Sequence, residues 1–304
     1  EYGIDDGGTL KIAWRFATDW GKPQHDDPAG LNYYSVTHSG DGRVTHRWDP
    51  KGYVRPWQKC LVIDVAEWAL AKGDTIAVVY GGPTAGSPGT VAQTFREHTF
   101  EFKVIVDAFG TGQFVEIEAQ PEIEIVPDVA ARLVLLAPTR VAMDEDFALG
   151  VKLEDEWGNP AVGYRGRVAL EAPTGVTGLP TTVAFDGHEG GAQRLEGVRA
   201  GAVETFTIAA CAGLAERLSG ESNPIECVRA HQPLRPFWGD LHGHTYCSDG
   251  THSPEFYYHY GRAIGNLDFC ALTDHDVFSQ DSWQAMIDTA ARANEPGKFT
   301  TFLG

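Results

Sequence analysis

Histidine and aspartate residues gather in two short runs near one end of this 304-residue chain. The first run, FWGDLHGHTYCSDG, contains His242, His244 and Asp249, and the second, FCALTDHD, contains His275. Imidazole nitrogens and carboxylate oxygens bind first-row transition metals such as Zn, Mn and Fe. A lone His-x-His is more often structural or exposed, but the joint pattern of both runs favours a shared metal site.

The segments around these residues alternate between strand and helix patterns. Three apolar runs typical of strands begin at Phe237, Asp268 and Phe299, each 31 residues after the one before. Between the first two, Ser253 and Pro254 form a helix start signal, with Ser253 as the N-cap. This order of elements predicts βαβ units and therefore a parallel sheet or barrel.

The predicted strands explain how the four side chains come together. The carboxyl ends of parallel strands meet at one edge of a sheet or barrel. Side chains two apart on a strand point to the same side, which brings His242 and His244 together. His275 follows the second strand at the equivalent position, and Asp249 lies in the first loop. We therefore expect all four to face one centre.

Two motifs in this region resemble a known family. The stretch DLHGHTYCSDG (Asp240–Gly250) is similar to the first motif of the PHP (polymerase and histidinol phosphatase) superfamily, and LTDHD (Leu272–Asp276) is similar to its second. The resemblance covers residues 237–304, which are 68 of the 304 residues. It implies a distorted (βα)7 barrel, a hydrolase of the phosphoesterase class and up to three bound metal ions (Zn, Mn or Fe).

The resemblance also implies roles for individual residues. His242, His244, Asp249 and His275 would be metal ligands of the catalytic centre. Asp240 and Asp274 would orient those ligands by hydrogen bonds. In the intact protein, metal-activated water would hydrolyse a small anionic phosphoester.

The third motif of the family is incomplete in this sequence. Its Gly-x-Glu would place the glycine at Gly304 and the glutamate at position 306, beyond the last residue. We therefore expect a chain that contains the first βαβαβ part of the barrel and lacks the later ligands. Such a fragment would be inactive, with partial or no metal occupancy.

The rest of the chain has the pattern of β-domains. Short β-branched runs separated by Gly, Pro and Asp predict a β-sandwich over residues 1–128. The same pattern over residues 129–230 predicts a second sandwich, which we interpret as immunoglobulin-like. The predicted fold class is thus multidomain, two N-terminal β-sandwich domains followed by the barrel fragment at 236–304.

The amino-acid composition disfavours some classes of binding partner. The chain has 24 Lys and Arg against 42 Asp and Glu, a formal charge of −18, which disfavours nucleic acid as a partner. No apolar run has the length of a membrane-spanning helix. The compartment, cytoplasmic or periplasmic, stays open. The five cysteines have no close pairs, which favours free thiols, with a Cys211–Cys227 bridge as the alternative.

Two other functions fit the sequence. In one, the sandwiches contact a glycan, a cell-envelope component or a protein, and the barrel is degenerate. In the other, the metal centre hydrolyses C–N bonds. His25, beside Asp26 and Asp27, is interpreted as part of a polar loop rather than an ion site. A cluster of tryptophans is interpreted as core rather than as a sugar-stacking platform: Trp14, Trp20, Trp48, Trp57 and Trp68.

Overall fold

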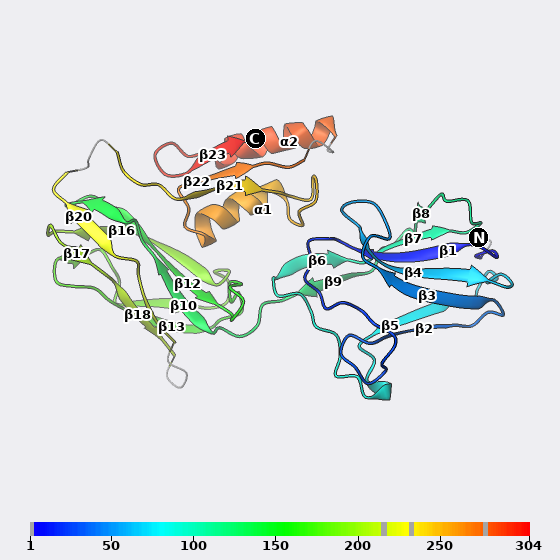
Figure 1. Ribbon diagram of the computed structural model, residues 1–304. Coiled ribbons are helices and arrows are strands. Elements are labelled where there is room, and N and C mark those ends of the chain that lie inside the picture. Colours follow the sequence, from blue (N-terminus) through cyan, green and yellow to red (C-terminus); the bar gives the residue numbers. More distant parts are fainter. Residues whose placement is uncertain (1–2, 214–217, 231–233, 276–278) are drawn as a thin grey trace. The chain divides into compact units, whose positions relative to one another are not determined.

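The computed structural model describes residues 3–213, 218–230, 234–275 and 279–304 (Figure 1). The chain divides into two compact units, Glu1–Ile125 and Val126–Gly304. The further division of the second unit near residue 230 stays a prediction.

The first unit is built from antiparallel strands. Its main sheet has the order β3-β4-β1-β7-β8, and two smaller sheets pair β2 with β5 and β6 with β9. A 3₁₀ turn, η1, covers Pro83–Ala85. The strands are β1 (Thr9–Trp14), β2 (Tyr34–His38), β3 (Arg43–Asp49), β4 (Lys59–Ala66), β5 (Ile76–Tyr80), β6 (Glu97–Glu101), β7 (Lys103–Asp107), β8 (Val115–Glu116) and β9 (Glu122–Ile125).

The centre of this unit is strand β4, which is covered on both faces. Successive side chains of a strand point to opposite sides, so Leu61 and Ile63 face one way and Cys60 and Val62 the other. Leu61 and Ile63 pack with Tyr34 of β2, and Cys60 and Val62 pack with Trp57. Burial on both faces explains why KCLVIDVA is a nearly continuous apolar run.

The tryptophans of the first unit have different environments. Trp14 is buried and its ring contacts those of Trp20 and Trp48 at 5.7 and 4.8 Å between centroids. Trp57 is buried against the other face of the sheet. Trp68 is 77% exposed, in a turn where its φ is +92°. The core interpretation was therefore wrong for Trp68, because a turn residue with positive φ projects away from the sheet.

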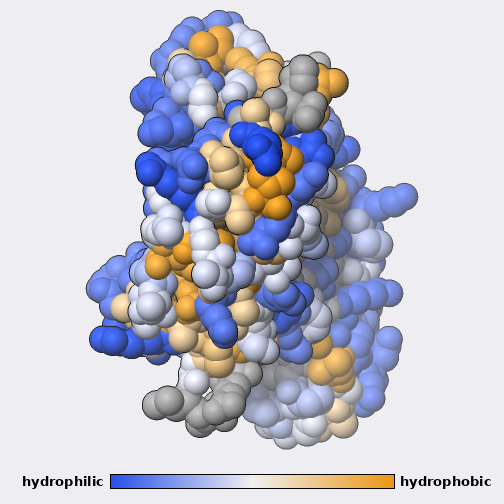
Figure 2. All heavy atoms as spheres, turned by 90° about the vertical axis from the view of Figure 1, so that its left-hand side faces the viewer, coloured by the Kyte–Doolittle hydropathy of each residue, from blue (hydrophilic) through white to orange (hydrophobic). Residues whose placement is uncertain are grey.

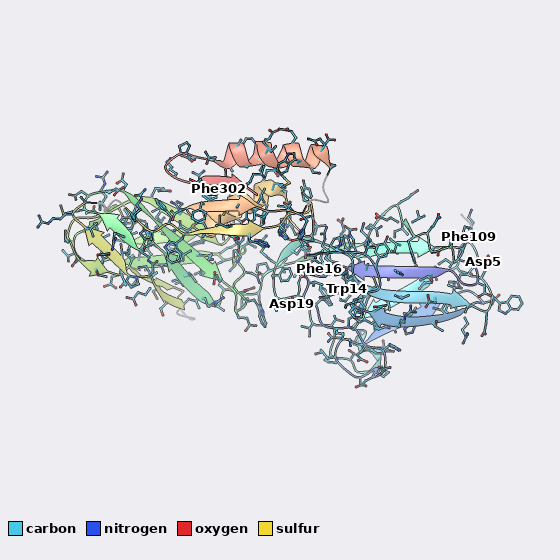
Figure 3. The ribbon with its side chains drawn as sticks, turned by 45° about the horizontal axis from the view of Figure 1, so that its top comes forward. Asp5, Trp14, Phe16, Asp19, Phe109 and Phe302 are labelled. Atoms are coloured by element: carbon cyan, nitrogen blue, oxygen red, sulfur yellow. The ribbon has the colours of Figure 1, made fainter. Side chains whose placement is uncertain are left out.

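Five of the residues labelled in Figure 3 mark the two ends of the first unit. Trp14, Phe16 and Asp19 lie near one end, and Asp5 and Phe109 near the other. At the second end, the amide of Asp5 donates to the carbonyl oxygen of Ala108 at 2.8 Å, which holds the N-terminal segment against the loop after β7.

Residues 126–230 form a β-sandwich. It has two four-stranded sheets, β10-β12-β16-β14 and β15-β13-β18-β19, and a three-stranded sheet, β11-β20-β17. The strands are β10 (Arg132–Leu136), β11 (Arg140–Ala142), β12 (Phe147–Glu154), β13 (Gly166–Glu171), β14 (Val176–Thr177), β15 (Thr182–Phe185), β16 (Ala192–Ala200), β17 (Thr205–Phe206), β18 (Ala209–Ala212), β19 (Leu218–Glu221) and β20 (Ile225–Val228).

One hydrophobic core fills this sandwich. Leu149 and Val151 of β12 and Val168 of β13 are fully buried in it, so both four-stranded sheets contribute. At the end of β12 a tight turn is held by Asp155, whose carboxylate accepts the amides of Trp157 and Asn159, each at 2.9 Å. The assignment of this sandwich as immunoglobulin-like stays a prediction.

The C-terminal segment of the second unit has a different architecture. Three parallel strands form a sheet in the order β21-β22-β23. Helix α1 continues into the π-helical turn η2, and helix α2 follows β22. The elements are β21 (Gly239–Gly243), α1 (Pro254–His259), η2 (Tyr260–Ile264), β22 (Phe269–Leu272), α2 (Gln280–Ala293) and β23 (Thr300–Leu303).

Local sequence signals account for these elements. The Ser253 hydroxyl accepts the Phe256 amide at 3.2 Å, so the predicted N-cap is confirmed. Tyr258 of α1 and Met286 of α2 are buried in one core with Leu272 of β22, which ties both helices to the sheet. Asn266, after η2, donates to the carbonyl oxygen of Leu136 at 3.3 Å and so contacts the sandwich.

The predicted barrel is wrong. In the residues that the structure describes, the three parallel strands form an open sheet and no barrel is closed, while most of the chain is β-structure. A 31-residue repeat fits any βαβ crossover, since parallel strands always need a long connection. The 31-residue repeat therefore located the strands but did not indicate whether they form an open sheet or a closed barrel.

Neither α-helix in the described part of the chain has the length and apolar composition needed to cross a lipid bilayer. On the face drawn in Figure 2, apolar residues form separate patches among hydrophilic ones. All five cysteines lie among the described residues and are free.

Candidate metal centre

The first candidate residues come from strand β21 and the residue after it. Pairing of β21 with β22 is regular at Asp240 and resumes at Gly243, where three steps along β21 match two along β22. This bulge breaks the strict alternation of side chains. His242 is exposed on the bulge, and its ring centroid lies 4.8 Å from that of His244. Phe302 of β23, labelled in Figure 3, marks the opposite edge strand of the sheet.

The loop after β21 is fixed by a carboxylate from the end of β22. Asp274 is buried, and its Oδ1 accepts the Thr245 amide at 2.7 Å and the Ser248 hydroxyl at 2.6 Å. Its Oδ2 accepts the Thr245 hydroxyl at 2.8 Å. One side chain thus holds two points of the loop, so the position of Asp249 depends on Asp274.

Asp249 lies between two imidazoles. Its Oδ1 is 2.7 Å from His244 Nδ1, and its Oδ2 is 3.2 Å from His275 Nε2. The Asp249 side chain is 7% exposed, that of His244 19% and that of His275 45%. A nearly buried carboxylate therefore faces two ring nitrogens, with His275 on the solvent side.

Two glycines make this approach possible. A Cβ on Gly250 would lie 2.3 Å from the backbone oxygen of His244, and one on Gly243 would lie 2.1 Å from the Tyr257 ring. Real Cβ contacts are never so short. A Cβ at Gly250 would displace the backbone and one at Gly243 would displace the Tyr257 ring, and these two glycines bracket the loop that carries Asp249.

Side chains around the loop are held in their protonated forms. Burial raises the pKa of the Cys247 thiol, which makes it a poor thiolate ligand. Burial, and then the nearby Asp240 carboxylate, raise the pKa of Tyr257. The Tyr257 hydroxyl donates to the carbonyl oxygen of Ala271 at 2.9 Å, and Asp240 Oδ1 accepts the His242 amide at 3.0 Å.

The donor set fits a transition-metal ion. Ligand atoms of His244, Asp249 and His275 all lie within 4.8 Å of one another. Two imidazoles and one carboxylate suit Zn, Mn or Fe. Without a metal, the same geometry lets each imidazole N–H donate to one Asp249 oxygen.

The structure brings together three of the four predicted ligands. His242 is outside the group because the bulge after Asp240 changes the direction of the strand. Asp274 orients the loop through Thr245 and Ser248, while the Asp240 carboxylate contacts the backbone of its own strand. Sequence reasoning missed Thr245 and Ser248, although small hydroxyl residues between two candidate ligands are a signal for such loop bonds.

Comparisons with known proteins give distant relatives. No family model matches the chain. It is 24% identical over 314 residues to an uncharacterised protein of Chlamydia trachomatis, covering 94% of this chain and 46% of that protein. It is also 24% identical over 260 residues to an uncharacterised protein of Chlamydia pneumoniae, covering 78% and 39%. The chain spans about half the length of the curated relatives it matches.

Similarity to solved structures is weak. The chain aligns with the Escherichia coli adhesin FdeC at 14% identity and a TM-score of 0.23, covering 73% of this chain and 60% of that one. It aligns with extracellular domains 3–5 of Drosophila OTK at 12% identity and a TM-score of 0.24, covering 76% and 71%. Scores this low do not establish a shared fold.

These findings correct the family assignment. No family model matches, and the described structure is mostly β-sheet without a closed barrel. The PHP assignment and the phosphoesterase activity predicted from it are therefore wrong. The error has a clear origin, because short runs of His and Asp fix the types of ligand but not the reaction.

Proposed function

We propose that this chain is a binding protein built on β-sandwiches, whose C-terminal α/β segment holds a divalent transition-metal ion. His244, Asp249 and His275 are the ligands. The observation that carries the proposal is the approach of their ligand atoms to within 4.8 Å around a nearly buried carboxylate. Such a carboxylate stabilises a cation, since it is the charged group nearest to the two imidazoles.

The metal is Zn, Mn or Fe. Imidazole binds all three, and the single carboxylate keeps the site suited to borderline rather than soft ions. When bound, the ion supplies a positive charge that replaces the N–H groups now facing Asp249. The exposed side of His275 leaves room for a ligand from solvent.

A zinc titration of the full chain tests this proposal. Isothermal titration at pH 7.5 should give one tight site, and Asp249→Asn should weaken it by about 100-fold, because an amide keeps the shape but loses the charge. His98→Ala is the matched control, since His98 is exposed on β6 and pairs with Glu124 in the first unit. Equal zinc affinity for the wild type and Asp249→Asn would contradict the proposal.

A second candidate function rests on a cavity in the sandwich. It has a volume of about 790 Å³ and is lined by residues that include Val129, Val162, Tyr164 and Arg165. Ligand sites are concave, mostly apolar and supplied with a few polar groups, which describes this lining. We propose a glycan as its occupant, with the Tyr164 ring for stacking and Arg165 for hydrogen bonding.

Glycan-array binding tests the cavity. Arg165→Ala and Val129→Asp should each reduce binding, because one removes a donor and the other introduces a charge into the apolar wall. Trp157→Ala is the control, since Trp157 is 59% exposed but does not line the cavity. If only Trp157→Ala lost glycan binding, the glycan would contact the turn after β12 and not the cavity.

A further inference from the structure

A second cluster of ring nitrogens lies in the first unit. The Tyr34 hydroxyl is 3.1 Å from His25 Nδ1 and 3.2 Å from His46 Nδ1. The ring centroids of His25 and His46 are 4.9 Å apart, and each lies within 5.4 Å of the Tyr34 ring. Two imidazole nitrogens thus lie within hydrogen-bond distance of one phenol oxygen, and the three rings contact one another.

Backbone pairing places these residues. Tyr34 begins β2, and its amide donates to the Gln24 carbonyl oxygen at 2.8 Å. The Gln24 amide donates in turn to Asn32 at 3.0 Å, which holds the loop containing His25 beside the strand. His46 lies on β3 between Val44 and Trp48, on the partly buried side of that strand. The cluster therefore rests on two strands and one hydrogen-bonded loop.

The hydrogen bonds around the Tyr34 phenol require that the two imidazoles differ in which ring nitrogen carries the proton. A phenol has one proton, so it donates to only one of the two Nδ1 atoms. The other Nδ1 must carry a proton of its own and donate to the phenol oxygen. A cation in place of the phenol proton would accept lone pairs from all three atoms at once.

The separations fit such a cation. Neighbouring ligand atoms bound at about 2.0–2.1 Å in the tetragonal geometry that Cu²⁺ prefers lie about 2.9 Å apart. The observed N···O separations of 3.1 and 3.2 Å need little adjustment. Asp26 lies 3.8 Å from the other nitrogen of His25, and it adds negative charge near the site.

We propose that His25, Tyr34 and His46 form a second metal site, which binds Cu²⁺ through two imidazoles and a phenolate. Copper is the divalent ion that imidazole sites bind most strongly. The His25 side chain is 42% exposed, so the ion and a fourth ligand from solvent can reach the site. This site is independent of the proposed metal centre in the second unit.

The binding step releases one proton. Bonds form between copper and two Nδ1 atoms and the phenol oxygen, the O–H bond breaks, and the proton passes to the buffer. The histidine that carried a proton on Nδ1 moves it to Nε2, so no further proton is lost and no redox change occurs. Copper affinity should therefore rise about tenfold per pH unit near neutrality.

A copper titration of the full chain carrying His244→Ala and His275→Ala tests the proposal. These substitutions remove the other cluster. We expect one equivalent of Cu²⁺ to bind, together with a phenolate-to-copper charge-transfer absorption. Affinity should be about tenfold higher at pH 8 than at pH 7 in a buffer that does not bind copper.

Variants of the cluster assign the ligands. Tyr34→Phe should abolish the absorption and weaken binding by about tenfold or more, while it keeps the buried ring. His25→Ala, on an exposed loop where folding is not at risk, should also weaken binding. His38→Ala is the control, because the His38 side chain is exposed at the end of β2 and its Nδ1 lies 3.1 Å from the Gly40 carbonyl oxygen, away from the cluster. Unchanged affinity in His25→Ala, or an absorption that survives Tyr34→Phe, would overturn the proposal.

Discussion

The two histidine clusters of this chain differ in the group that their imidazoles share. In the second unit the shared group is the Asp249 carboxylate, which is nearly buried and contacts His244 and His275. In the first unit it is the Tyr34 phenol, between His25 and His46. A carboxylate is charged at neutral pH, whereas a phenol must first lose a proton. The comparison teaches that similar ring geometry gives two sites with different proton requirements.

The clusters also differ in what holds them. The first rests on strands β2 and β3, while the second rests on a loop that a carboxylate from the neighbouring strand holds in place. Substitutions of the loop should therefore disturb the second cluster and leave the first intact.

The largest effect is expected at Gly250. Gly250→Ala puts a Cβ 2.3 Å from the His244 carbonyl oxygen, so the backbone must move. We expect a loss of about 3 kcal/mol in the free energy of unfolding of the second unit, and loss of zinc binding. Urea unfolding and zinc titration measure the two effects. Gly163→Ala is the control, because nothing lies within 4 Å of a Cβ there. If Gly250→Ala kept wild-type zinc affinity, the conformation of the loop after β21 would not determine the metal site.

An intermediate effect is expected at Asp274. Asp274→Asn leaves at least one of its three donors without an acceptor, which costs about 1–3 kcal/mol. Zinc affinity should fall by about tenfold, because the Asp249 loop loses its support. Asp155→Asn in the sandwich is the matched comparison, since that buried carboxylate also accepts several hydrogen bonds. Asp155→Asn should lower the free energy of unfolding by a similar amount without changing zinc affinity. If Asp155→Asn also lowered zinc affinity, the effect of Asp274→Asn would come from reduced stability rather than from the loop.

The smallest effect is a pH dependence of the first unit. Burial, and then repulsion from His25, lower the pKa of His46. The folded state therefore disfavours the protonated ring, which would also face His25 and Tyr34. The stability contributed by neutral His46 is complete above the unfolded pKa of about 6.5 and declines as pH falls towards the folded pKa.

Thermal melting between pH 7.5 and pH 5 measures this decline. His46→Gln removes the titrating group and should flatten the part of the profile that His46 causes. His98→Ala is the control, since His98 is exposed. An unchanged profile in His46→Gln would show that the stability of the first unit does not depend on pH through this residue.

The sequence was sufficient for local features of the second cluster. The 31-residue repeat located β21, β22 and β23 to within two residues of their starts, and Ser253 caps α1. The spacing of His244, Asp249 and His275 predicted their approach, because each follows the end of a strand or lies in the next loop. Their function as metal ligands stays a proposal.

The remaining features depend on contacts that no local pattern contains. The bulge after Asp240 displaces His242, and strict alternation cannot foresee it. His25 was interpreted as part of a polar loop, since its partner His46 lies 21 residues away on another strand and Tyr34 has the pattern of a core residue. The (βα)7 barrel to which this segment was assigned was inferred from the family resemblance, and the described structure, mostly β-sheet without a closed barrel, contradicts it.

The bond between Asp274 and Thr245 spans 29 residues and has a consequence for the order of folding. The loop after β21 cannot adopt its final conformation until α1 has formed and β22 has paired with β21. It is therefore among the last parts of the segment to become ordered. Once formed, the Thr245 amide is shielded by a buried acceptor. Its proton should exchange with deuterium only when the two strands separate, which makes this amide a reporter of the opening of the whole α/β segment.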